Sequence, residues 1–288
     1  MDRSLPSVDV NILAYNSEQW IASAIESVLA QTWPNIELTI IDNRSTDDTI
    51  KIARNYQKSV PWIHVYPAAV NGGSILNCER AFMLGSAEFV MPKTADDIIA
   101  PDFVEKAMTV LLNVPDCVMC HAAGLIFTGD GTVTQTYPKE HRLHAVDEDI
   151  VERARHVMMH YTSAPSFWGV YRRSAVHRLA RFRYAAGWDH AVLAELALYG
   201  EIRHVPEVLY FRRDGGKSVR DIARACNEAV QRGHELADQW TDFLWMTPLI
   251  TTAFNHIDVF SRARVDQSKR LTLIEDAARI FARDGCRS

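Results

Sequence analysis

The sequence predicts an α/β protein with a mostly parallel sheet flanked by helices, followed by a helical C-terminal extension. Between Val8 and about Val90, short extended apolar runs alternate with amphipathic helical segments, which is the pattern of β-α-β units. After Ser218 the pattern is helical almost to the end. The 288 residues are 48% hydrophobic and 23% charged, and they contain neither an internal repeat nor a low-complexity linker. This composition is enough to bury a sizeable core.

The first part of the chain alternates strands and helices. We expect strands at 8–14, 36–41, 62–66 and 88–91, and helices at 17–30, 46–56 and after Gly72-Gly73. The first helix has apolar residues at helical spacing and ends near Trp33-Pro34, because proline cannot continue a helix. At the second helix, Ser45 is followed three residues later by Asp48, which is the spacing of a capping box.

The second part is less regular. A hairpin is expected from 117–128 and 133–137, joined by Gly129-Asp130-Gly131. Helices are expected at 145–160, 172–182, 189–199, 245–260 and 268–283, and two short strands at 202–205 and 208–211. We therefore expect one α/β domain over 1–218 and a helical extension over 219–288.

One segment of the extension has an apolar stripe. Residues 241–260 carry apolar side chains at steps of three or four, namely Trp245, Leu249, Ala253, Ile257 and Phe260. The segment lacks the Lys/Arg-rich polar face of a membrane-binding helix. We expect it to dock on the domain or to pair with a second copy of the chain in a homodimer.

Charge and cysteine content limit the partners. The net charge is −5, from 31 Lys and Arg against 36 Asp and Glu, and no basic run is long enough to follow a nucleic acid backbone. No apolar stretch reaches the roughly 18 residues needed to span a membrane. The chain enters a strand pattern directly, without a secretory signal, and its five cysteines are widely spread, so we expect reduced thiols and a cytoplasmic location. Cys117 and Cys120 have the spacing of half a zinc site, but no second pair follows and core packing is favoured.

Polar residues follow three of the predicted strands. Tyr15-Asn16 closes the first strand, Asp42 closes the second, and Asp96-Asp97 come shortly after the fourth. In open α/β sheets, ligands bind at the carboxyl ends of parallel strands. We therefore expect one crevice lined by these residues, although each of them taken alone is equally suited to a turn or a helix cap.

The motifs as a set resemble the family 2 glycosyltransferases, which are inverting enzymes of the GT-A (nucleotide-diphospho-sugar transferase) fold. The likeness covers about residues 8–218 and is most specific in the first block, 8–49, with its strand, Tyr-Asn, helix, Gln-Thr-Trp-Pro segment, strand and Asp-x-x-Ser-x-Asp. Later blocks follow in the family's order, at Asn71-Gly72-Gly73, Asn77, Glu88-Phe89-Val90, Thr94-Ala95-Asp96-Asp97, Gly187-Trp188-Asp189 and 200–212. The resemblance implies a nucleotide-binding half at about 1–115 and an acceptor half at about 116–218.

The resemblance also implies roles for single residues. Asp42 accepts a hydrogen bond from the base of the donor, most simply the uracil of a UDP-sugar, and Ala14-Tyr15-Asn16 line the nucleoside. Asp96 is the last acid of an Asp-x-Asp motif that binds Mg²⁺ or Mn²⁺ against the diphosphate. Asp189 is the general base that takes the proton of the attacking hydroxyl, or alternatively a helix N-cap. The further donor-site positions are Glu18, Asn71, Asn77, Thr94, Ala95, Arg212 and Lys217.

Two departures from the family pattern bear on the metal. Thr94 stands where the first acid of Asp-x-Asp belongs, with Lys93 before it, and Lys93 could pair with Asp96. Asp214 stands about where many relatives have a metal-binding histidine, and an oxygen ligand suits Mg²⁺ or Mn²⁺. Alternatively, Arg212, Arg213 and Lys217 themselves neutralise the diphosphate.

Acceptor recognition is expected from residues 120–190. Trp168 and Trp188 could stack on an acceptor, and His160, Tyr161 and His190 could reach the same cleft, although core packing is the commoner fate of such residues. We expect an inverting transferase that moves a sugar to a hydroxyl of a glycan or small molecule. A catalytically silent nucleotide-sugar-binding protein is the main alternative, and the absence of a glycine-rich phosphate loop disfavours a nucleotidyltransferase.

Overall fold

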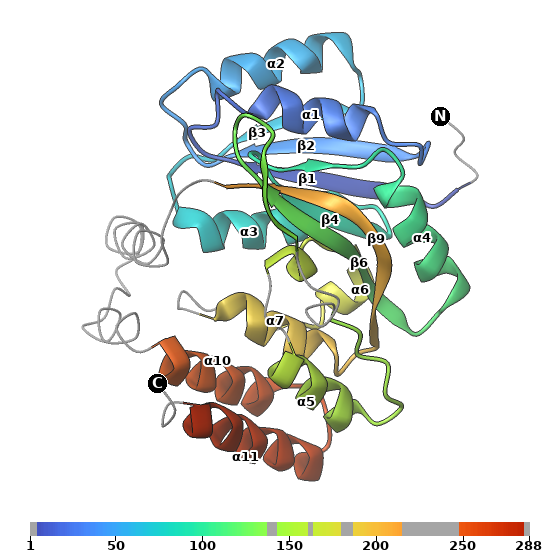
Figure 1. The fold of residues 1–288 in the computed structure, drawn as a ribbon, viewed down its shortest axis with the longest axis vertical. Coiled ribbons are helices and arrows are strands. Elements are labelled where there is room, and N and C mark those ends of the chain that lie inside the picture. The colour runs from blue at the N-terminus through green and yellow to red at the C-terminus, as the bar shows by residue number, and fades with distance from the viewer. Residues whose placement is uncertain (1–4, 137–142, 161–163, 180–186, 215–247, 285–288) are drawn as a thin grey trace.

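The computed structural model describes residues 5–136, 143–160, 164–179, 187–214 and 248–284. Its strands form one mixed sheet in the order β3-β2-β1-β4-β8-β6-β9-β5, with β7 paired to β6 (Figure 1). Helices cover both faces of this sheet, and the α/β class expected from the sequence is confirmed.

The N-terminal part of the sheet is parallel. It contains β1 (Val8–Ala14), β2 (Ile36–Asp42), β3 (Ile63–Pro67) and β4 (Phe89–Thr94). The connecting helices are α1 (Ile21–Leu29), α2 (Thr49–Ser59) and α3 (Gly73–Met83). α1 and α2 lie on one side of the sheet and α3 on the other (Figure 1). The strands are almost completely buried in β1 and β4, as a sheet covered on both faces requires.

The rest of the sheet has mixed directions. It contains β5 (Ile98–Ile99), β6 (Cys117–Phe127), β7 (Val133–Thr136), β8 (Gly169–Arg172) and β9 (Glu201–Arg213). Its helices are α4 (Phe103–Asn113), α5 (Ile150–His160), the 3₁₀ turn η2 (Ala164–Phe167), α6 (Arg173–Val176) and α7 (Trp188–Leu196). The predicted hairpin between β6 and β7 is confirmed.

The strand predictions were wrong at three places in this part. β9 is one strand and not two, because Pro206 and Glu207 bulge out between Val205, which pairs with Ala122, and Val208, which pairs with Ala123. Proline has no N–H for the ladder and is tolerated at such bulges. β5 and β8 were not predicted, because strands of two and four residues give little periodicity.

A buried ion pair fixes β8 and α6 against the N-terminal part of the sheet. Arg173 Nη2 lies 2.5 Å from Asp9 Oδ2, and both side chains are less than a tenth exposed. The same guanidinium donates to the carbonyls of Phe82, Leu84 and Ala87 in the connection from α3 to β4. Because the charge is both paired and hydrogen-bonded, its burial is compensated.

The C-terminal helices α10 (Pro248–Arg262) and α11 (Gln267–Asp284) pack on α5 and α7 below the sheet (Figure 1). Phe260 is fully buried in the same core as residues of α5 and α7. Ala253 and Ile257 pack against this core. Arg155 of α5 forms a partly buried ion pair with Asp276 of α11. The predicted docking of the apolar stripe is therefore confirmed for these three stripe residues. Trp245 lies outside the described residues, the side chain of Leu249 is not described, and the homodimer stays a prediction.

The starts of α1, α2 and α5 differ from the predictions. α2 begins at Thr49 and not at residue 46, and α5 begins at Ile150 and not at residue 145. α1 begins at Ile21 and not at Ser17, because residues 17–20 form a turn in which Ser17 N donates to Thr49 Oγ1 at 2.7 Å. The predicted capping box at Ser45 and Asp48 does not form. The Ser45 hydroxyl instead accepts a hydrogen bond from Asn16 N at 2.9 Å. Within the described ranges, no helix is long and apolar enough to cross a bilayer.

Candidate active site

The parallel register brings the predicted strand ends to one edge of the sheet. Ala14 pairs with Asp42, and Leu13 pairs with Thr94. The backbone pairing continues one residue past each strand, since Asn43 N donates to Ala14 O at 2.8 Å and Ala95 N donates to Leu13 O at 3.0 Å. The loops that follow β1, β2 and β4 therefore begin side by side.

Asp42 has an unused acceptor at this edge. Its side chain is fully buried, and Oδ2 accepts a hydrogen bond from Ser45 N at 2.9 Å. Oδ1 is buried and has no hydrogen-bond partner among the described residues. An unpaired buried carboxylate oxygen is costly, and native proteins retain such groups where a ligand or another function explains them. Asp42 can thus accept a hydrogen bond from an N–H group of a ligand.

The β1–α1 loop and the β2–α2 loop are tied together by their own polar groups. Asn16 Oδ1 accepts from Thr46 N at 2.9 Å, while Asn16 N donates to Ser45 Oγ. Glu18 Oε2 accepts from Asp48 N at 2.9 Å. The side chains of Asn16 and Glu18, both predicted to bind the donor, therefore bind the neighbouring loop.

Both loops contain backbone in the left-handed region. Asn16 has φ 48° and Arg44 has φ 64°, and within the described residues these are the non-glycine residues with positive φ. Such conformations persist where the surrounding contacts impose them, and they cluster at ligand-binding sites. Tyr15, next to Asn16, is 47% exposed, so its ring is available to a ligand.

The two predicted asparagines after β3 have different surroundings. Asn71 Oδ1 accepts from Gly73 N at 2.9 Å and from Asn43 Nδ2 at 2.8 Å, so it helps to build the start of α3. Asn77 is buried, with Nδ2 donating to Ile41 O at 3.3 Å and Oδ1 without a partner. Asn77 thus leaves a second unpaired buried oxygen close to the end of β2.

The turn after β4 is built around Asp97. Thr94 Oγ1 and Tyr210 OH donate to Asp97 Oδ2 at 2.7 and 2.6 Å, and Arg213 N donates to Asp97 Oδ1 at 2.8 Å. Asp97 is 3% exposed and Ala95 is 2% exposed. Burial and then the charge of Asp96 raise the pKa of Asp97, while the hydrogen bonds from Tyr210 and Thr94 oppose that rise. Both carboxylate oxygens of Asp97 thus accept hydrogen bonds from the protein, and these bonds hold the turn in place.

Lys93 lies inside this turn. Its side chain is fully buried, and its ammonium donates to the carbonyl oxygens of Thr94 and Asp97. Burial lowers the pKa of Lys93 to about 8, even though the charges of Asp97 and Asp96 act in the opposite direction. The sequence suggested an ion pair between Lys93 and Asp96. Among the described residues this contact does not form, because the ammonium points to carbonyl groups.

Asp96 is the acid of the turn that remains accessible. It is partly exposed, and in the described part of the chain no hydrogen bond to its carboxylate is formed. Its carbonyl accepts from Arg213 Nε at 3.0 Å, and the Arg213 guanidinium lies 4.0 Å from the ring centre of Trp20 and 4.5 Å from that of Phe127. Trp20 was not among the predicted site residues. A single aromatic residue at the start of a helix carries no sequence signal for such a stacking contact.

The other predicted metal and phosphate residues follow β9. Arg212 is half-buried on the strand, and Asp214 is exposed with its N–H donating to Phe127 O at 2.7 Å. Lys217 lies outside the described residues. Over the ranges that the structure describes, no three His, Cys, Asp or Glu side chains are grouped to hold a metal ion.

Asp189 lies in the first turn of α7. The N-cap of this helix is Gly187, with φ 72°, so the alternative that Asp189 is an N-cap is wrong. Burial, and then the charge of Asp189, raise the pKa of the Cys78 thiol on α3. Burial and then the charges of Cys78 and Asp189 likewise raise the pKa of Tyr171 on β8. The Asp189 carboxylate therefore lies near α3, the helix that also carries Asn77.

The predicted acceptor residues are mostly in contact with the core. The rings of Trp168 and Trp188 both meet Phe167 edge to face, at centroid distances of 5.1 and 5.2 Å. His190 Nδ1 lies 2.7 Å from His256 Nε2, which links α7 to α10. His160 is exposed on α5, and Tyr161 lies outside the described residues. A role of these residues in acceptor binding stays a prediction.

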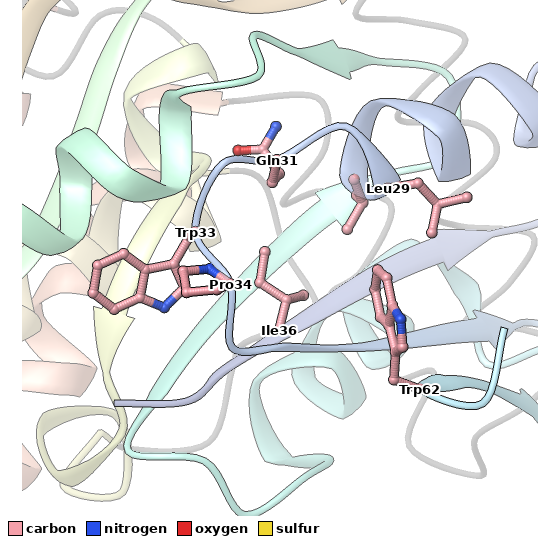
Figure 2. Close-up of a pocket in the computed structure, with 7 residues that line it drawn as sticks. Leu29, Gln31, Trp33, Pro34, Ile36 and Trp62 are labelled. Atoms are coloured by element: carbon pink, nitrogen blue, oxygen red, sulfur yellow. The ribbon is translucent and has the colours of Figure 1, made fainter. Parts of the chain in front are cut away.

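A separate pocket lies at the opposite edge of the sheet. Figure 2 shows it between the end of α1 and the start of β2, with a volume of about 240 Å³. It is lined by Val28, Leu29, Gln31, Trp33, Pro34, Ile36 and Trp62. Since Asp42 ends the strand that Ile36 begins, this pocket is not the polar site described above.

Comparison with known proteins gives a consistent picture. The family model for glycosyl transferase family 2 matches residues 9–179. EpsH of Bacillus subtilis (strain 168), named as a glycosyltransferase, is 29% identical over 215 residues, which are 71% of this chain and 54% of EpsH. YibD of Escherichia coli (strain K12), named as an uncharacterized glycosyltransferase, is 26% identical over 239 residues, 76% of this chain and 68% of YibD. The chain thus spans about half the length of EpsH.

Two solved structures share the fold. S. aureus TarS 1-349 in complex with UDP-GlcNAc matches with a TM-score of 0.61 at 17% identity, covering 96% of this chain and 81% of that one. The mannosyltransferase PcManGT from Pyrobaculum calidifontis, in complex with GDP-Man and Mn²⁺, matches with a TM-score of 0.52 at 14% identity, covering 95% and 80%. At these identities the likeness supports the fold alone.

Proposed function

The chain belongs to the family 2 glycosyltransferases and has their GT-A fold, and from this premise we propose that it transfers one sugar, with inversion, from a nucleotide diphosphate sugar. The donor we propose is a UDP-sugar, and the acceptor is a hydroxyl of a glycan or a small molecule. The nucleotide occupies the edge where β1, β2 and β4 end.

The observation that carries this proposal is the unpaired Oδ1 of Asp42. Uracil has an N–H group that can donate to this oxygen, and the bond would remove the cost of an unsatisfied buried carboxylate. The exposed ring of Tyr15 can cover the base from the neighbouring loop. The diphosphate then extends toward the turn of Asp96, because that turn starts beside the end of β1.

We assign the general base to Asp189. Inversion by a single displacement needs a carboxylate opposite the leaving group, which takes the proton of the acceptor hydroxyl as its oxygen attacks. Asp189 suits this role because it is only half-buried and is held at the start of a buried helix. The positive end of the α7 dipole favours a negative charge at this position.

The described residues do not fit the Mg²⁺ or Mn²⁺ site that the resemblance implies. The Thr94 hydroxyl is bound to Asp97, and both oxygens of Asp97 accept hydrogen bonds from the protein. Asp96 is then the one carboxylate of the turn left for a cation, and the turn already contains the charges of Lys93 and Arg213. No step of the proposed reaction is therefore assigned to a metal ion.

We also propose a cytoplasmic location. Cys78, Cys117 and Cys120 are buried free thiols, as expected for a protein in a reducing compartment. The homodimer through the C-terminal helices remains a proposal. In the region described, those helices pack on α5 and α7 of the same chain.

A donor panel tests the proposed function. Purified protein is mixed with UDP-, GDP- and dTDP-sugars, and binding is measured by calorimetry and turnover by the release of nucleoside diphosphate. We expect turnover of at least one UDP-sugar. Asp189→Asn should lower turnover about 100-fold or more while UDP affinity stays the same, because the base acts only in the reaction step.

The matched control is Asp147→Asn, at an exposed acid in the connection before α5, which should change neither quantity. Loss of UDP affinity together with turnover in Asp189→Asn would show that this residue builds the site and is not its base. Binding of UDP without turnover of any donor would support the catalytically silent binding protein instead.

A further inference from the structure

Lys93 is a buried cation for which the proposed reaction has no direct use. It lies on β4 after Met91 and Pro92, which are also buried, at a point where a strand covered on both faces normally carries an apolar side chain. An ammonium group at such a place is unfavourable unless it is hydrogen-bonded and has negative charge nearby. Lys93 has both, since its donors bind two carbonyl groups and the acids Asp96 and Asp97 lie close enough to act on it.

Arg213 is a second cation fixed at the same turn. Its Nε–H donates to Asp96 O at 3.0 Å, and its guanidinium carbon lies over the rings of Trp20 and Phe127, 4.0 and 4.5 Å from their centres. Stacking on two rings restricts the guanidinium and keeps it partly desolvated. Lys93 and Arg213 thus place two basic side chains beside the acids Asp96 and Asp97.

These cations also orient the backbone of the turn. The carbonyl oxygens of Thr94 and Asp97 point to the Lys93 ammonium, and the carbonyl oxygen of Asp96 points to Arg213. Carbonyl oxygens carry partial negative charge, so turning three of them toward protein cations removes them from the path of an approaching anion. The field of a buried ammonium is also less screened than that of an exposed lysine.

We propose that Lys93 and Arg213 are the resident cations of the diphosphate subsite, so that this chain binds a nucleoside diphosphate without a divalent metal ion. Lys93 is a positioning residue, because it acts through the turn and does not touch the ligand. The inference rests on the proposed function, since it concerns the same donor site. The presence of Thr94 where the family pattern has an acid agrees with this inference. A further carboxylate at that position would give the turn an excess of negative charge.

The test is UDP affinity with and without metal, measured by calorimetry on the full chain in EDTA and in MnCl₂, with GDP, CDP and dTDP beside UDP. For the wild-type chain we expect dissociation constants in the two buffers that agree within about threefold. A larger weakening in EDTA would overturn the inference and leave the proposed function standing. Binding of none of the four nucleotides in either buffer would overturn both.

Two variants test the role of Lys93 itself. Lys93→Met replaces the lysine by an unbranched apolar side chain that is one atom shorter and suits a buried strand, and we expect it to weaken UDP binding in EDTA about tenfold or more. Lys93→Met combined with Thr94→Asp restores an acid and removes the cation, and we expect this double variant to bind UDP at least about tenfold tighter in MnCl₂ than in EDTA. Lys58→Met, at an exposed lysine of α2, is the control and should behave as wild type.

The variants overturn the inference if Lys93→Met binds UDP in EDTA as tightly as the control does. If either variant fails to fold, as judged by its thermal unfolding transition, the wild-type comparison in the two buffers still decides the question. The readout is binding, so it does not depend on finding the sugar or the acceptor.

Discussion

Replacing Asp42 by asparagine should reverse the hydrogen-bonding character of the atom that faces the nucleobase. Asp42 Oδ2 accepts a hydrogen bond from Ser45 N at 2.9 Å, and Oδ1 is buried without a partner in the described part of the chain. In Asp42→Asn the amide oxygen must stay toward Ser45 N, because that neighbour can only donate. The amide NH₂ then takes the place of Oδ1.

The expected loss follows from this geometry. Uracil presents an N–H donor at N3, which binds a carboxylate oxygen but meets another donor in the variant. A hydrogen bond to a charged acceptor contributes about 1.5–3 kcal/mol, so UDP affinity should fall roughly 12- to 150-fold. Cytosine presents an acceptor at N3, so CDP should lose much less and the preference for UDP over CDP should narrow or reverse.

Calorimetric titration of the wild-type chain and of Asp42→Asn with UDP and CDP tests this prediction. Thermal unfolding of each protein without nucleotide shows whether the fold is intact. The unfolding midpoint should change little, because one unpaired buried atom replaces another. Asp116→Asn, at an exposed acid before β6, is the matched control. Unchanged UDP affinity in a folded Asp42→Asn variant would refute the assignment of Asp42 to the base.

Two further predictions concern the stability of the scaffold. Arg173→Met leaves the Asp9 carboxylate buried and without its ion-pair partner, so the free energy of unfolding should fall by about 3–5 kcal/mol in chemical denaturation. Arg262→Met removes an exposed ion pair on α10 and should lower the free energy of unfolding by less than about 1 kcal/mol. Equal losses in the two variants would contradict the account of the buried pair. Burial lowers the pKa of His256 in the folded chain from 6.5 to about 4. As the pH falls, the unfolded chain therefore takes up a proton before the folded chain does. The free energy of unfolding should decrease between pH 6.5 and 4 by up to about 3 kcal/mol. His256→Gln should flatten this dependence, and wild-type and variant curves that stay parallel across the window would rule the explanation out.

Local sequence patterns predicted the elements from β1 to β4 well, but they missed β5 and α4. The strands and helices from β1 to β4 occur in the expected order because each run is long enough for its period to be recognised and is bounded by Pro, Gly or Asn. The same patterns failed for β8, which has four residues, and for β9, where Pro206 suggested two strands. In β9 the pairing with β6 continues past the bulge, and no local signal reports that pairing.

The candidate site divides in the same way. Polar residues at three strand ends could be recognised from the sequence, because parallel strands bring their carboxyl ends to one edge of a sheet. Which oxygen atoms stay unused there could not be predicted. The roles of Asp96 and Asp97 look alike in sequence, yet Tyr210, which is 113 residues from Asp97, occupies the Asp97 carboxylate and leaves Asp96 accessible.

The sequence by itself determined the family, the alternation of strands and helices, and the acids at the strand ends, because these depend on residues close together along the chain. Only the tertiary structure decided that Lys93 is buried, that Arg213 lies over the rings of Trp20 and Phe127, and that Asp189 lies near α3. Burial and charge pairing depend on segments that meet only when the chain has folded. The type of a single residue does not determine which distant group will form its hydrogen bonds or ion pairs.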